Sequence, residues 1–67
     1  MFDKVNQLIE YNTQDLVKML VEANGCSVSE AMSTLYNSKT YAGLIDPETG
    51  LYRESPSYLF DLLERVG

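Results

Sequence analysis

The chain of 67 residues contains no histidine, a single cysteine and no apolar run longer than three residues. Without a second cysteine, Cys26 cannot form an internal disulfide. Without histidine, its thiol lacks an imidazole base, and a thiolate–imidazole zinc site cannot be built. Such short apolar runs exclude a transmembrane helix. We therefore expect no catalytic residue, no metal and no cofactor, and we predict that the protein is not an enzyme.

Basic residues are also few, because five Lys and Arg stand against ten Asp and Glu, and the formal net charge is −5. A negative charge repels the phosphate backbone, which supplies most non-specific affinity for nucleic acids. No two bases are adjacent in the sequence, so no basic patch is visible. The scattered bases are Lys4, Lys18, Lys39, Arg53 and Arg65. The composition therefore argues against nucleic acid as a partner.

The short length predicts one small domain, residues 1–67. A chain of this size buries only about 60% of its unfolded surface, and its core rarely supplies more than roughly 3–5 kcal/mol. With no disulfide or metal to add stability, close helix packing or oligomerisation must do so. The N-terminal residues show no charged segment followed by an apolar one, as a signal peptide would. Together with the unpaired Cys26, this predicts a cytoplasmic protein.

Residues 3–23 are predicted to form the first helix, because apolar residues recur there at steps of three and four. Asp3 is a candidate N-cap, and Gly25 stands where a glycine ends a helix. Asn12 interrupts the apolar stripe, and the polar stretch "YNTQD" leaves a helix break near Asn12–Thr13 open as an alternative. The expected core-facing residues are Val5, Leu8, Ile9, Leu16, Met19, Leu20 and Ala23.

A second and a third helix are predicted to follow. Ser27 and Glu30 have the spacing of a capping box, and the helix they begin runs to about Tyr36. After a turn at Asn37-Ser38, a short helix begins at Ser38 or Thr40, although its internal glycine costs about 1 kcal/mol relative to alanine. The expected core-facing residues are Val28, Ala31, Met32, Leu35 and Tyr36 in the second helix, and Tyr41, Leu44 and Ile45 in the third.

The stretch "DPETGLYRESPSY" (46–58) contains both prolines of the chain. "DPETG" has the composition of a turn, and "LYRE" is expected to be extended or irregular. Ser55 and Pro56 then fit the N-cap and first position of a last helix. In that helix Asp61 and Arg65 are spaced as an ion pair. Its expected apolar face consists of Tyr58, Leu59, Leu62 and Leu63.

No stretch alternates long enough to predict a strand. The fold class is therefore all-α, a small bundle of three to four short helices with a Pro/Gly turn before the C-terminal helix. A helix-turn-helix pair at about residues 10–37, packed by the C-terminal helix, is the expected arrangement.

Two binding sites are weakly supported. Asp46, Glu48, Thr49 and Glu54 could offer oxygens to a cation, but their spacing does not fit the calcium loop of an EF-hand. Residues 27–45 could form a DNA-binding helix-turn-helix, with only Lys39, Thr40 and Tyr41 on the recognition helix. Three residues are few for phosphate and base contacts, and the negative net charge disfavours DNA binding.

Five tyrosines stand in the chain, mostly in its second half. They either fill the core with their hydroxyls at the rim or form a contact surface for a partner, since tyrosine is enriched at interface hot spots. Both interpretations are compatible with the sequence. The candidate partner contacts are Tyr41, Leu51, Tyr52, Arg53 and Tyr58.

The stretch "YNSKTYAGLIDPETGLYRESPSYLFDLLERVG" resembles small uncharacterised all-helical bacterial proteins that are often encoded beside toxin-like or accessory genes. The resemblance covers residues 27–65 best. It implies a bacterial protein that acts as the antitoxin or accessory half of a pair, and it supplies no catalytic residue.

The functional hypothesis is a non-enzymatic protein–protein interaction module. Its partner would be another protein or a second copy of the chain in a homodimer. In the first case, the negative charge of the chain would steer it to a basic surface on that protein. The rival hypothesis is a small DNA-binding regulator.

Overall fold

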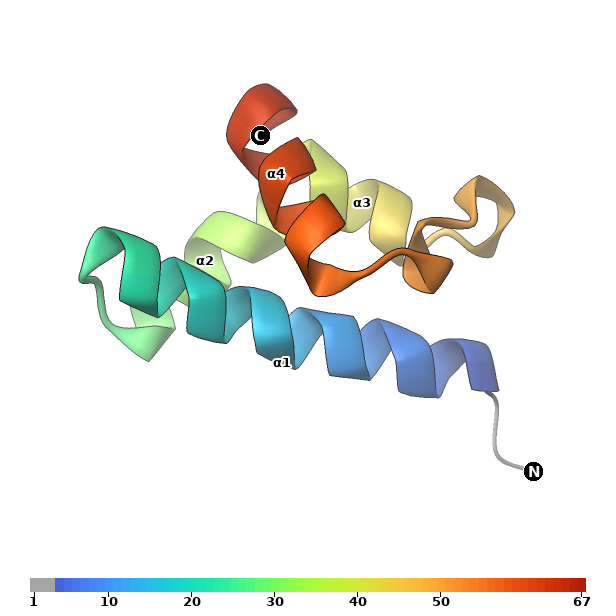
Figure 1. The fold of residues 1–67 in the computed structure, drawn as a ribbon, viewed down its shortest axis with the longest axis horizontal. Coiled ribbons are helices and arrows are strands. Elements are labelled where there is room, and N and C mark those ends of the chain that lie inside the picture. Colours follow the sequence, from blue (N-terminus) through green and yellow to red (C-terminus); the bar gives the residue numbers. More distant parts are fainter. Residues whose placement is uncertain (1–3) are drawn as a thin grey trace.

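The computed structural model describes residues 4–67, which form four α-helices and two 3-10 turns, with no strand among them (Figure 1). The long α1 runs along one side of the molecule, with α2, α4 and η2 against it, while α3 packs on α2 and α4. The all-α prediction is confirmed, whereas the predicted Asp3 cap lies outside the described residues. The elements are α1 (Lys4–Asn24), α2 (Val28–Tyr36), α3 (Lys39–Leu44), η1 (Pro47–Thr49), η2 (Leu51–Arg53) and α4 (Pro56–Val66).

Three of the helices have a serine as N-cap. The capping box at α2 is confirmed, since Ser27 Oγ accepts from the Glu30 amide at 3.1 Å and the Glu30 carboxylate accepts from the Ser27 amide at 3.0 Å. Ser38 caps α3 by accepting from the Tyr41 amide at 3.0 Å, which decides between the two predicted starting points. Ser55 caps α4, with Pro56 as its first residue. These bonds satisfy amide groups that have no partner within a helix.

We predict that Ser27→Ala lowers the free energy of unfolding by about 1 kcal/mol, because the Glu30 amide loses its acceptor. Ser29→Ala is the matched control, since Ser29 is exposed inside the same helix and makes no capping bond. Chemical denaturation followed by circular dichroism measures both. Equal effects of the two substitutions would contradict the role of the cap.

Helix α1 is continuous through Asn12 and Thr13, so the predicted alternative of a break there is wrong. Thr13 Oγ1 donates to the Ile9 carbonyl at 2.7 Å and is satisfied within the helix. Asn12 is 2% exposed, and its Nδ2 donates to the carbonyls of Tyr52 at 3.1 Å and Glu54 at 3.4 Å. Its Oδ1 accepts no hydrogen bond from residues 4–67. The apparent gap in the apolar stripe is therefore a long-range contact.

We predict that Asn12→Ala lowers the free energy of unfolding by about 1–3 kcal/mol, because the carbonyls of Tyr52 and Glu54 lose their donor. The exposed Asn24→Ala at the end of the same helix should change it far less. Thermal or urea unfolding compares the two variants. An Asn12 variant as stable as the wild type would contradict the proposed tie between α1 and the 51–54 segment.

Among residues 4–67, seven buried apolar side chains form the core, and they come from α1, α2, α3 and α4. In α1, Leu16 and Leu20 face it as predicted. Leu8 and Ala23 are exposed, however, and Val17 and Val21 pack against the core in their place. The neighbouring helices cover this flank of α1, which its own sequence pattern does not reveal. The buried apolar residues are Leu16, Leu20, Ala31, Leu35, Leu44, Leu59 and Leu63.

The predicted core faces of the shorter helices were too wide. Among the apolar residues described in these helices, only Ala31 and Leu35 of α2, Leu44 of α3, and Leu59 and Leu63 of α4 are buried. A short helix against a small core buries about one narrow row of side chains, and the residues beside that row stay exposed. The predicted core residues that are exposed are Val28, Met32, Tyr36, Ile45 and Tyr58.

The segment before α4 contains two successive 3-10 turns, η1 and η2. The prediction that "LYRE" is extended or irregular is therefore wrong for Leu51–Arg53. Asp46 caps η1 by accepting from the Glu48 amide at 3.0 Å. Gly50 has φ 72°, a left-handed conformation that favours glycine and reverses the chain between η1 and η2. Thr49 Oγ1 donates to the Gly43 carbonyl at 2.6 Å and ties the loop to α3.

Gly43 has a packing reason. A Cβ at this position would lie 2.8 Å from Leu51 Cδ1, so its absence leaves room for the end of the Leu51 side chain against α3. An internal glycine is unfavourable for helix formation. Here it leaves room for Leu51, which packs against the core.

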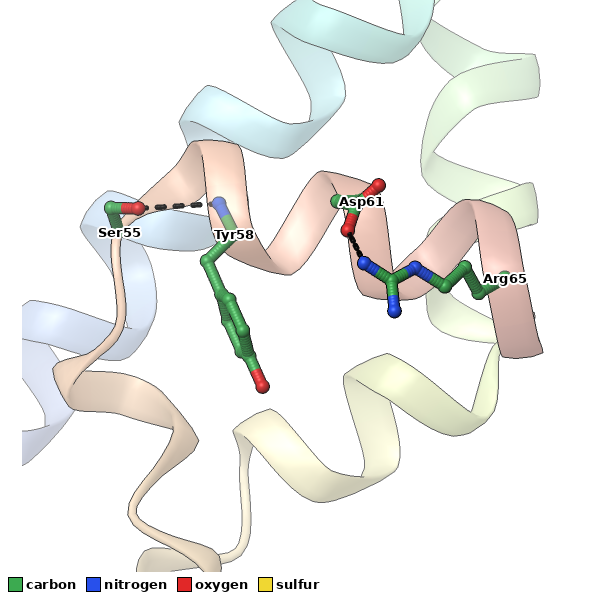
Figure 2. A network of polar contacts seen from close by, with 4 residues as sticks. All are labelled: Ser55, Tyr58, Asp61 and Arg65. Atoms are coloured by element: carbon green, nitrogen blue, oxygen red, sulfur yellow. Dashed lines mark hydrogen bonds and ion pairs between the residues drawn. The ribbon is translucent and has the colours of Figure 1, made fainter.

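On α4 the predicted pair forms on the surface, where Arg65 donates to the Asp61 carboxylate (Figure 2). Both side chains are largely exposed, so we expect little stability from this pair.

Candidate interaction surface

The five predicted contact residues come from three elements and have different surroundings. Leu51 and Tyr52 of η2 are half-buried and pack against the core. Arg53 is exposed, and its guanidinium carbon lies 5.5 Å from the centroid of the Tyr52 ring, a cation–π distance. This part of the predicted set therefore docks the loop onto the body of the protein, as the core interpretation of the tyrosines expected.

The other two predicted residues lie on helices. Tyr58 is 49% exposed on α4, and its amide donates to the Ser55 cap while its ring extends away from the helix (Figure 2). Tyr41 of α3 is half-buried and belongs to the residues that pack on the core. Its ring centroid lies 5.0 Å from that of Tyr36, with the planes tilted by 51°. That arrangement is typical of favourable aromatic pairs.

The ring contact joins apolar side chains of two successive helices into one surface. Val28, Met32 and Tyr36 follow one another at four-residue steps along α2, and Tyr41 and Ile45 do so along α3, so each set shares a helix face. Val28 is 56% exposed, and Tyr36 and Ile45 are each 47% exposed. We call these five residues the α2–α3 face.

Four of these residues were absent from the predicted contact set. Val28, Met32, Tyr36 and Ile45 were assigned to the core, because their spacing is that of an apolar helix face. The sequence does hold a signal, namely that α2 and α3 carry more apolar positions than one narrow row of contacts can bury. Only the position of neighbouring helices shows which of them stay outside.

The other residues considered as candidate sites form contacts with residues close to them in the sequence. Cys26 is half-buried and packs against the core, and its Sγ donates to the Leu20 carbonyl at 3.7 Å. The oxygens of Asp46 and Thr49, considered for a cation, are engaged in the turn. Among residues 4–67, no group of three His, Cys, Asp or Glu side chains is arranged to hold a metal ion. No helix in the same range has the length and apolarity needed to cross a membrane.

A hollow of about 290 Å³ lies where the C-terminal ends of α1, α2 and α4 meet. Leu20 and Leu63 contribute its apolar lining, and Asn24 and Asn37 contribute amides. Of the described residues that line it, Glu64 has the one ionisable side chain. A single carboxylate without a second titratable group beside it does not form an acid–base pair of the kind used in catalysis.

Comparison of the chain with protein-family models, with curated proteins and with solved structures found no match.

We predict that Tyr52→Ala lowers the free energy of unfolding by about 1–3 kcal/mol, because its ring packs against the core. Tyr58→Ala should change it by less than about 0.5 kcal/mol, because that ring is half exposed and outside the core cluster. Thermal unfolding of the two variants tests this division of the tyrosines. The reverse order of stabilities would contradict it.

Proposed function

We propose that this chain is a non-enzymatic protein–protein interaction module, with the α2–α3 face as its main contact. The observation that carries the proposal is the exposure of four large apolar side chains on adjoining helices, joined through the ring contact of Tyr36 with the half-buried Tyr41. Contiguous exposed apolar surface is typical of interaction sites. Tyr36 and Tyr41 add the residue type that most often anchors interfaces.

The biological setting is part of the same proposal. The resemblance of residues 27–65 to small bacterial proteins encoded beside toxin-like or accessory genes supports a bacterial, cytoplasmic, antitoxin-like or accessory role. The net charge of −5 supports it as well, because negative charge away from the contact can speed the approach to a basic partner.

The rival hypothesis of a DNA-binding regulator loses support from the surroundings of its recognition helix. Thr40 is 2% exposed, and its amide and hydroxyl both donate to the Gly67 carbonyl, at 2.9 and 3.1 Å. It is therefore engaged inside the protein and does not face a groove. Of the three residues considered for DNA contact, Lys39 is the exposed one, and a single cation is a small share of the phosphate contacts that specific binding uses.

The test is photo-crosslinking in cells that naturally express the chain. A photoreactive phenylalanine analogue replaces Tyr36 in one variant and Tyr11 in the other. Tyr11 is the matched control, because it is a tyrosine 57% exposed on α1 and outside the α2–α3 face. We expect a defined protein adduct from position 36 and none from position 11. An absence of adducts at position 36, or the same adducts at both positions, would count against the proposed function.

A further inference from the structure

We propose that the occupant of the α2–α3 face is a second copy of this chain, in a symmetric dimer that sets the same face of two copies against each other. The inference rests on the proposed function and adds the partner. In a two-fold dimer each interface residue meets the same patch on the other copy. A self-complementary patch must therefore be apolar or carry balanced charge.

The distribution of acidic residues selects this face. All ten acids lie outside residues 31–45, where the single charged residue is Lys39. Four of the five residues of the face fall in this acid-free stretch, whereas Val28 lies before Glu30. Glu30 and Asp46 flank the stretch, and a carboxylate oxygen of each accepts a backbone amide, from Ser27 and from Glu48. Two chains of charge −5 repel each other, and acids set opposite acids in the contact would add to that cost. The acid-free stretch is where the repulsion is least.

The other large exposed apolar side chains lie on α1 and α4, whose described residues include three and two acids, whereas α2 carries one, Glu30, and α3 none. Tyr11 of α1 stands between Glu10 and Asp15, and the same helix carries Glu22. Tyr58 and Val66 of α4 share their helix with Asp61 and Glu64. A second copy placed on either helix would bring acids near acids. A basic partner would be drawn to those helices, whereas the α2–α3 face offers it no acid between residues 31 and 45.

The size of the molecule is compatible with such a dimer. A standard stable interface takes about 800 Å² from each partner, which is roughly a sixth of the 4524 Å² surface of the chain. Two adjoining helices with five apolar side chains, two of them paired tyrosines, are a suitable core for that area. The seven-residue apolar core of the monomer also leaves stability to be gained from a partner.

Sedimentation equilibrium over a concentration series is the test, with the wild type, Tyr36→Glu, Met32→Lys and Tyr11→Glu. We expect a monomer–dimer equilibrium in the wild type. Either substitution within the face should weaken dimerisation by at least about ten-fold, because an unpaired charge enters the interface. Tyr11→Glu adds the same charge to another exposed tyrosine and should leave the dissociation constant within about two-fold of the wild type. Circular dichroism confirms that each variant is folded.

The salt dependence separates the two kinds of occupant. Raising NaCl from about 50 to about 300 mM screens repulsion between the two acidic copies, so the dimer should become tighter. A complex held by attraction to a basic protein would weaken over the same range. A chain that stays monomeric throughout, or a dimer that Tyr36→Glu and Met32→Lys leave intact, would overturn the inference. If a monomeric chain still gives a crosslink to another protein at position 36, the proposed function stands and the self-association fails.

Discussion

The hydrogen bonds from the Asn12 amide fix the relation between the two halves of the molecule. Asn12 lies in the middle of α1, and the carbonyls it binds, those of Tyr52 and Glu54, lie immediately before α4. Because α4 begins at Pro56, holding these carbonyls against α1 also places the start of the last helix. Leu51 and Tyr52 then pack on the core next to this tie. In so small a domain, one buried amide can determine where a whole helix packs.

The α2–α3 face stays uncovered because the other segments of this small domain pack elsewhere. Helix α2 turns Ala31 and Leu35 inward, and α3 contributes Leu44, so the other apolar residues of both helices stay on the flank. The loop and α4 are held by Asn12 and by contact with α3, as Thr49 and Gly43 show. No described segment is therefore left to cover Tyr36 and its neighbours. The α2–α3 face is therefore exposed because the loop and α4 pack against other parts of the molecule.

Local features of this fold were predictable from the sequence, and long-range ones were not. The caps at Ser27 and Ser55 depend on residues within three positions, so spacing alone predicted them. Asn12 looked like a flaw in an apolar stripe, because its acceptors lie 40 and 42 residues away. For the site, Tyr41 could be proposed from composition. Tyr36 could not be distinguished from a core residue, because periodicity shows which residues share a face and not which faces meet.

The central claim is that the Asn12 side chain holds the 51–54 segment on α1, and its own amide protons report on this directly. Nuclear magnetic resonance can follow the hydrogen exchange of the Asn12 Nδ2 protons beside those of the exposed Asn6 and Asn24. We predict that the Asn12 protons exchange markedly more slowly, because they are buried and bound to the carbonyls of Tyr52 and Glu54. Exchange at the rate of the two exposed asparagines would contradict it.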